Sequence, residues 1–251
     1  MTDVDLSALA RGRGGSQRLA GRLVRPVGEG PWPGVVMLHE AFGIDEVMNR
    51  QVERMARAGY LALMPDLYSD GGIRRCLVST LRAVGSGRGR AYADIEAARQ
   101  WLLDQPDCTG RVGVLGFCMG GGFALMTVGS GFDAASSNYG MLPKDLDRAL
   151  ADSCPVVLSY GGRDLGLRGA TAKLESALER AGVVHDSREY PGAGHSFLND
   201  AEVGPRVLRP LMKVAGVGPD PQAAADAWRR IDAFFAEHLG GAEAPSAGSG
   251  A

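Results

Sequence analysis

The strongest constraint on the fold is the regular alternation, or rhythm, of short apolar runs with segments whose apolar residues recur at helical spacing. Runs buried on both sides by helices are almost wholly apolar, as the middle runs are here. Strands that alternate with helices in this way predict an α/β fold with a mainly parallel sheet of about seven or eight strands. The predicted strands are Gln17–Val24, Gly34–Leu38, Tyr60–Met64, Arg111–Leu115, Ala134–Asn138, Val156–Tyr160 and Val184–Tyr190.

Helix boundaries are marked by capping residues. Asp45 is placed to cap a helix that Gly59 ends, because a short polar side chain accepts from free N–H groups and glycine tolerates the left-handed turn that follows. Gly182 ends another helix in the same way. The Asp220-Pro221 pair predicts the start of the last helix.

The length of 251 residues and 45% apolar composition suit one large domain, which we predict over residues 17–239. Residues 1–16 are predicted to be a flexible segment, and the Gly/Ala/Ser/Pro-rich residues 240–251 a disordered tail. Two segments interrupt the rhythm, at 70–90 and 199–218, and both are candidate cap elements over a pocket.

Charge and targeting signals restrict the partners of the chain. A net charge of −2 lacks the basic excess that a phosphate backbone requires, so a nucleic acid partner is not expected. The chain shows neither a signal-peptide pattern nor a membrane span, and we expect a cytoplasmic protein without a membrane partner. Its four cysteines are widely spaced and are expected to be reduced thiols.

A possible nucleophile lies in the stretch Gly116-Phe117-Cys118-Met119-Gly120, which follows an apolar run and precedes a helical one. Glycines there permit the crowded turn of a nucleophile elbow, which pushes the central side chain outward. The following helix N-terminus favours a thiolate and leaves the N–H of Met119 free for an oxyanion. The alternative is that Cys118 is a small side chain buried at a strand-to-helix junction.

An activated thiol needs a base, and a base is usually oriented by an acid. His195 follows the last predicted strand in a glycine-rich loop, and Asp164 follows the strand before it. His185 and His238 lie within a strand and a helix and are better explained as structural or surface residues. The order Cys118, Asp164, His195, each after a strand, is the chain order of α/β-hydrolase triads.

A fourth group follows the strand Gly34–Leu38, in His39-Glu40-Ala41-Phe42-Gly43. In such a fold this loop supplies the second oxyanion N–H, for which Ala41 is the candidate. Glu40 would lie near the thiol and hold its proton until substrate arrives; a helix cap or a surface ion pair is the alternative. His39-Glu40 does not continue as H-E-x-x-H, so no metal site is predicted.

Taken together, these residues resemble the dienelactone hydrolase family, the carboxymethylenebutenolidases and their relatives, over roughly residues 17–239. The matching pieces are His39-Glu40-Ala-Phe-Gly43, Pro65-Asp66-Leu67-Tyr68, Gly116-Phe-Cys118-Met-Gly-Gly121, Gly161-Gly-Arg-Asp164 and Gly194-His195-Ser-Phe197. The resemblance implies a cysteine-dependent ester or lactone hydrolase of the α/β-hydrolase fold that needs neither metal nor organic cofactor. It makes Cys118 the nucleophile, His195 the base and then acid, Asp164 the orienting acid, and Glu40 the switch that deprotonates the thiol.

The substrate is less well defined by this resemblance. The family's arginine four residues beyond the histidine, which helps to hold a substrate carboxylate, is Asn199 here, and Arg74 or Arg75 is the candidate replacement. The residues expected to contact substrate are Phe42, Arg74, Arg75, Phe197 and Asn199. A catalytically silent protein that binds a small ligand or partner is the alternative function, and the sequence is compatible with a monomer or a homodimer.

Overall fold

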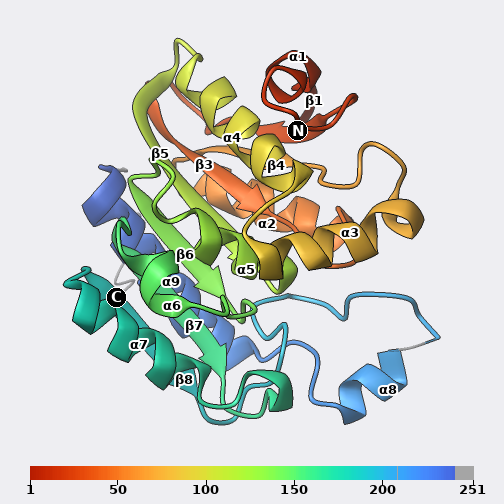
Figure 1. Cartoon of the computed structure of the whole chain (residues 1–251), viewed down its shortest axis with the longest axis vertical. Helices are drawn as coiled ribbons and strands as arrows, with labels where there is room; N and C mark the ends of the chain where they lie inside the picture. Colours follow the sequence, from red (N-terminus) through yellow and green to blue (C-terminus); the bar gives the residue numbers. More distant parts are fainter. Residues whose placement is uncertain (208, 241–251) are drawn as a thin grey trace, which may run out of the picture.

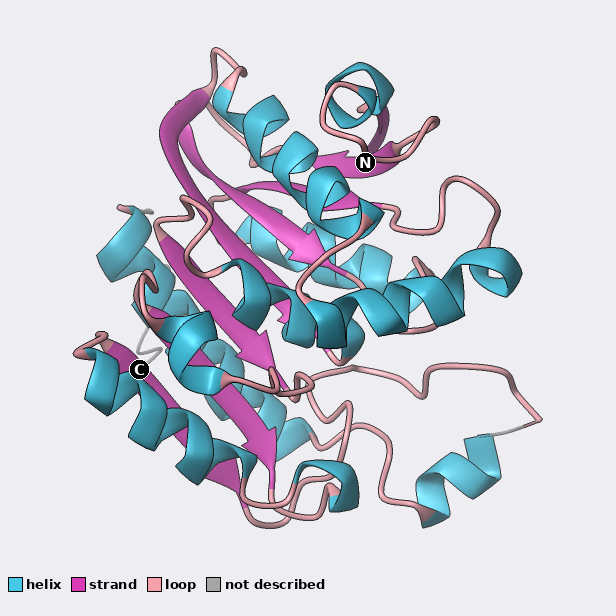
Figure 2. Ribbon diagram, in the orientation of Figure 1, coloured by secondary structure: helices cyan, strands magenta, loops and turns pink. Residues whose placement is uncertain are grey.

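The computed structural model describes residues 1–207 and 209–240. Eight strands form one sheet, in the order β1-β2-β4-β3-β5-β6-β7-β8 (Figures 1 and 2). β1 and β2 are antiparallel to their neighbours, and the strands from β4 to β8 run parallel to one another. The strands are β1 (Thr2–Asp5), β2 (Ala20–Val24), β3 (Trp32–Leu38), β4 (Leu61–Pro65), β5 (Cys108–Phe117), β6 (Ala134–Asn138), β7 (Val156–Gly161) and β8 (His185–Tyr190).

Helices cover both faces of the sheet, as the apolar middle strands predict. α2 and α9 pack on one face, while α1, α4, α5 and α7 pack on the other (Figure 1). The helices are α1 (Ser7–Arg11), α2 (Glu46–Arg57), α3 (Ile73–Ser86), α4 (Arg90–Leu103), α5 (Met119–Thr127), α6 (Leu146–Leu150), α7 (Ala170–Ala181), α8 (Arg209–Val214) and α9 (Pro221–Leu239), with a 3-10 turn η1 at Leu165–Leu167. The predicted α/β-hydrolase architecture is confirmed.

The predicted helix caps are present. The Asp45 carboxylate accepts from the N–H of Met48 at 2.9 Å, and that of Asp220 accepts from the N–H of Ala223 at 3.1 Å. Gly182 follows α7 in the left-handed conformation. These local signals fix where α2 and α9 begin and where α7 ends.

The N-terminus differs from the expectation of a flexible segment at 1–16. Thr2–Asp5 form β1, which pairs with β2 at the edge of the sheet. α1 then packs against α4, with Leu6 and Ala10 buried. A strand of four mostly polar residues has no apolar run to reveal it, and the edge position makes that composition tolerable.

The two segments that interrupt the rhythm each contain a helix. α3 lies within 70–90 and packs against α4 and α5 (Figure 1), with Cys76, Thr80, Ala83 and Val84 buried. α8 lies within 199–218. Except for Gly240, the predicted tail at 240–251 lies outside the described residues. Among the helices at 1–207 and 209–240, none combines the length and apolarity that a membrane crossing requires.

Candidate active site

Cys118 lies on a sharp turn between β5 and α5. Its backbone has φ 53° and ψ −113°, a conformation that non-glycine residues rarely adopt and that is typical of functional turns. The Cys118 N–H donates to the Asn138 carbonyl at 3.0 Å, and the Cys118 carbonyl accepts from Gly122 N–H at 3.1 Å. The turn is therefore held on both sides, and it presents a partly exposed thiol at the N-terminus of α5.

The glycines around Cys118 allow backbones to approach each other. A Cβ on Gly116 would lie 2.0 Å from the Gly120 carbonyl oxygen, and one on Gly120 would lie 2.1 Å from the Leu38 carbonyl oxygen. Contacts that close exclude any side chain at either position. The glycines predicted from the elbow pattern are thus required by the packing of α5 against β3 and β5.

His195 and Asp164 meet as the sequence predicts. Nδ1 of His195 lies 2.5 Å from Oδ2 of Asp164, whose other oxygen accepts from Gly166 N–H at 3.1 Å. Burial disfavours the imidazolium, but interactions with Asp164 and with the Cys118 sulfur outweigh it and raise the pKa of His195 to about 10. The three residues therefore come together, with the His195 ring between the Asp164 carboxylate and the Cys118 thiol.

The raised pKa of His195 predicts a pH-dependent stability. The imidazolium contributes fully below the ordinary histidine pKa of about 6.5, and its contribution is lost as the pH rises through about 10. We expect Asp164→Asn to lower the free energy of unfolding at pH 6.5 by at least about 1 kcal/mol more than at pH 10.5, as measured by urea titration.

Asp232→Asn is the matched control, because Asp232 pairs with Arg54 at 2.7 Å and arginine keeps its charge across this range. Its deficit relative to wild type should be the same at both pH values. A deficit of Asp164→Asn that is equally constant would contradict an ion pair between Asp164 and His195.

The Glu40 carboxylate is buried, and the two side chains that donate hydrogen bonds to it are neutral. Its carboxylate accepts from Ser196 Oγ at 3.0 Å and from Asn199 Nδ2 at 3.1 Å. Burial raises the pKa of Glu40, whereas His195 and these two hydrogen bonds oppose the rise. Glu40 does not form a surface ion pair, because its side chain is only 3% exposed. It does not cap α2 either, because Asp45 does so.

His39 fixes the backbone of the Glu40 loop. Its Nε2 accepts from the N–H of Leu67 at 3.2 Å, so Nδ1 carries the proton and donates to the Glu40 carbonyl at 2.7 Å. Burial lowers the pKa of His39, consistent with this neutral form. Tyr68 adds a second restraint, since its hydroxyl donates to the Ala41 carbonyl at 2.9 Å.

The predicted oxyanion donors lie on these two restrained segments. Met119 is the first residue of α5, and Ala41 follows Glu40 in the loop after β3. The Tyr68 hydroxyl lies 3.4 Å from the Met119 sulfur as well as beside Ala41, and so connects the two segments. Tyr68 belongs to the Pro65-Asp66-Leu67-Tyr68 motif, which is the signal in the sequence for this restraint.

The predicted substrate-contacting residues divide into two groups. Phe42 is 36% exposed, and Arg74 and Arg75 are exposed in the first turn of α3. Phe197 is instead fully buried, with ring centroids 5.5 Å from Tyr139 and 5.0 Å from Tyr190, so it is a core residue rather than a substrate contact. Asn199 is 2% exposed and supports Glu40.

Tyr139 was not predicted from the sequence. It follows β6 with φ 41°, its ring centroid lies 5.1 Å from that of His195, and it is fully buried. Burial raises the pKa of its hydroxyl, and the nearby Glu40 and Cys118 raise it further. The Tyr139 ring therefore packs against the His195 ring at a tilt, and its position after a strand end is the signal that the sequence offered.

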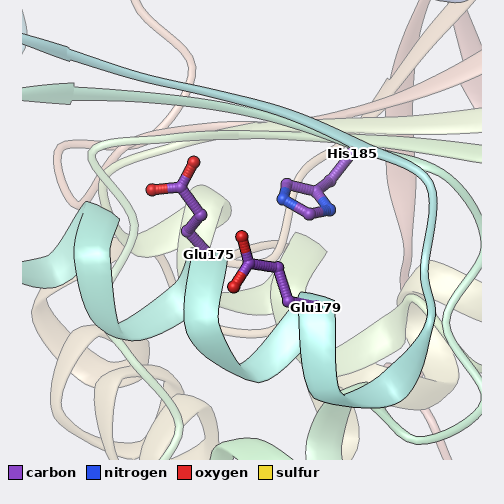
Figure 3. A group of neighbouring side chains, drawn as sticks. All are labelled: Glu175, Glu179 and His185. Atoms are coloured by element: carbon purple, nitrogen blue, oxygen red, sulfur yellow. The ribbon is translucent and has the colours of Figure 1, made fainter.

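One group of side chains outside this site has the character of a metal site. The ligand atoms of Glu175, Glu179 and His185 lie within 4.8 Å of one another (Figure 3). The two glutamates are exposed on α7, and His185 begins β8, at the amino ends of the parallel strands. Cys118 follows the carboxyl end of β5, so this group and Cys118 lie at opposite ends of the parallel strands.

Comparison with known proteins identifies the family. The sequence profile of the dienelactone hydrolase family matches residues 19–239. The chain belongs to the dienelactone hydrolase family. This match confirms the resemblance predicted from the sequence, and it identifies the chain as a carboxylic ester or lactone hydrolase.

Individual relatives agree with this family. Carboxymethylenebutenolidase from Pseudomonas putida is 29% identical over 73% of this chain and 83% of its own length. A dienelactone hydrolase-like promiscuous phosphotriesterase from metagenomic libraries shares the fold, with TM-score 0.77 and 24% identity over 95% of this chain and 98% of that one. Dienelactone hydrolase from Anabaena variabilis does too, with TM-score 0.65 and 23% identity over 95% and 97%.

Proposed function

We propose that this hydrolase cleaves small esters or lactones through a covalent acyl intermediate on Cys118. The observation that carries the proposal is the arrangement of Cys118 on a strained turn beside His195, whose Nδ1 lies 2.5 Å from Asp164. A ligand-binding protein without catalysis has no requirement for a thiol, an imidazole and a carboxylate in this order. The geometry therefore favours catalysis over the silent alternative.

Cys118 is favoured over the other cysteines as nucleophile. Burial raises the pKa of the Cys154 thiol to about 12 and also raises that of Cys108, so both remain protonated at neutral pH. Cys76 is buried beneath Tyr68, with its sulfur 3.8 Å from the Tyr68 carbonyl. Among the cysteines in the described part of the chain, Cys118 alone interacts with the His195 ring.

The proposed reaction has two stages. The Cys118 thiolate attacks the carbonyl carbon, the N–H groups of Met119 and Ala41 stabilise the oxyanion, and His195 protonates the leaving alkoxide. His195 then accepts a proton from water as the water attacks the thioester carbonyl. The C–S bond breaks, the acid is released, and the Cys118 thiolate recovers its proton from Glu40. Asp164 keeps the imidazole in the tautomer with the proton on Nδ1, and Glu40 is the proposed acceptor of the thiol proton when substrate binds.

An uncharged acyl group suits the surroundings of Glu40. The groups that donate to this buried carboxylate, Ser196 and Asn199, are neutral. The cation that acts on it, His195, is already paired with Asp164, so a second carboxylate would be desolvated without a cation of its own. Arg74 and Arg75 are exposed at the first turn of α3. We therefore propose small neutral esters or lactones as the preferred substrate class.

The experiment that tests the function is to trap the acyl group. Incubation with p-nitrophenyl acetate and acid quenching is expected to give a protein carrying one acetyl group, located by peptide mass spectrometry on the peptide containing Cys118. The matched p-nitrophenyl hemisuccinate, which adds a carboxylate to the acyl group, should be turned over more slowly. Acetylation confined to other residues, with turnover at background for both esters, would contradict the proposal.

A further inference from the structure

A second groove, of about 470 Å³, lies beside the Asp164–His195 pair without including Cys118. Three segments form its walls: the loop after β7, the loop after β8, and the end of α8 together with its connection to α9. Its volume falls within the range of sites that hold small metabolites.

The groove is rich in cations. Arg163, Arg168 and Lys213 line it, all three are exposed, and none forms an ion pair with any residue at 1–207 or 209–240. Asp220 is the acid in the lining, and its carboxylate already caps α9. The neighbouring Asp164 directs its carboxylate to His195 and Gly166. The lining therefore carries an excess of positive charge in a chain whose net charge is −2.

Backbone hydrogen bonds connect the walls of this groove to His195. The N–H of His195 donates to the Gly216 carbonyl at 3.0 Å, and the His195 carbonyl accepts from the N–H of Gly218 at 2.9 Å. The N–H of Arg163 donates to the Ala193 carbonyl at 2.9 Å. A Cβ on Gly194 would lie 1.7 Å from the Gly216 oxygen, so the two backbones are in direct contact.

We propose that this groove binds a small polyanion, an organic phosphate or a polycarboxylate, through Arg163, Arg168 and Lys213. Guanidinium groups bind phosphate and carboxylate oxygens bidentately, and lysine adds a point charge. A ligand held by all three cations joins the segment after β7, which carries Arg163 and Arg168, to the last turn of α8, which carries Lys213. Because the connection that follows α8 forms hydrogen bonds with both the N–H and the carbonyl of His195, occupancy restrains the backbone of His195.

Binding is tested by calorimetric titration of the full chain with inorganic pyrophosphate and with citrate, at an ionic strength held constant with sodium chloride. Wild type is expected to bind saturably, and the double variant Arg163→Gln/Arg168→Gln at least about tenfold more weakly, with Lys213→Gln about fivefold weaker. Lys173→Gln, an exposed lysine on α7, is the matched control and should bind as wild type. Because all four side chains are exposed, the Tm without ligand should change little.

The two probes distinguish the sources of the anion: pyrophosphate binding alone assigns a phosphate site, and citrate binding alone a polycarboxylate site. No saturable binding of either probe, or equal affinity in wild type and the double arginine variant, would overturn the proposal.

The connection to His195 has its own readout. The chain has four histidines, and the ring signal of His195 is assigned by its loss in His195→Gln. Saturating probe should shift this NMR signal more than that of His238, which packs on Phe234 in α9. A ligand that binds through the three cations and leaves the His195 signal unmoved would contradict the restraint on His195. This measurement needs no turnover, so it stands apart from the outcome of the acyl-trapping experiment.

Discussion

Replacing Cys118 with alanine is expected to lower kcat/KM for p-nitrophenyl acetate by about 10⁴-fold or more. In a covalent mechanism the nucleophile, base and orienting acid act as a unit, so removing the nucleophile removes most of the rate enhancement. The remaining turnover would come from the oxyanion donors of Met119 and Ala41 acting on attack by water. Steady-state kinetics at a pH where wild type is fully active measures the difference.

Cys108→Ala is the matched control for this prediction. Cys108 begins β5 and shares that strand with the segment leading to Cys118, but burial raises the pKa of its thiol. Its replacement should leave kcat/KM within about twofold of wild type, because it touches no residue of the proposed site. Equal rates for Cys118→Ala and wild type would rule out the thiol as nucleophile, and the family assignment would then need another catalytic residue to account for hydrolysis.

The sheet could be predicted from the sequence because buried parallel strands are apolar on both faces. The predicted Ala134–Asn138 is β6 itself, and the predicted Val156–Tyr160 differs from β7 by one residue. β1 could not be found in this way, because an edge strand needs no apolar run, and its four residues include two aspartates and a threonine. Edge strands are defined by the neighbour with which they pair, which a local pattern does not contain.

In the proposed site, too, some contacts can be predicted from the sequence and others cannot. The meeting of Asp164 and His195 follows from topology, since loops after parallel strands gather at one edge of the sheet. The environment of Glu40 does not follow from topology. Its partners Ser196 and Asn199 are 156 and 159 residues away in the chain, and no spacing rule brings those side chains to one carboxylate.

Phe197 and Asn199 show why position in a motif does not give a role. They stand two and four residues after His195, where a contact with substrate is the natural prediction. The positive φ of 61° at Ser196 turns the chain, and Phe197 then packs between Tyr139 and Tyr190 while Asn199 faces Glu40. A single left-handed residue, which a sequence pattern does not reveal unless it is glycine, redirects both side chains inward.

The second large effect is expected for Gly120→Ala, which should lower the free energy of unfolding by about 3 kcal/mol or more. The added Cβ would lie 2.1 Å from the Leu38 carbonyl oxygen and 2.5 Å from its carbon, so α5 must move away from β3. The helix propensity of alanine returns only about 1 kcal/mol. Urea unfolding followed by circular dichroism measures the change.

Gly85→Ala provides the matched control, because Gly85 lies within α3 and its Cβ would meet no atom within 4 Å. This substitution should stabilise the protein by about 0.5–1 kcal/mol, since alanine is the better helix former where nothing is crowded. We expect Gly85→Ala to be soluble and folded. Gly120→Ala is expected to unfold at a lower urea concentration or to fail to accumulate as folded protein. A stability of Gly120→Ala within about 0.5 kcal/mol of wild type would mean that the contact between α5 and β3 is not what fixes the turn at Cys118.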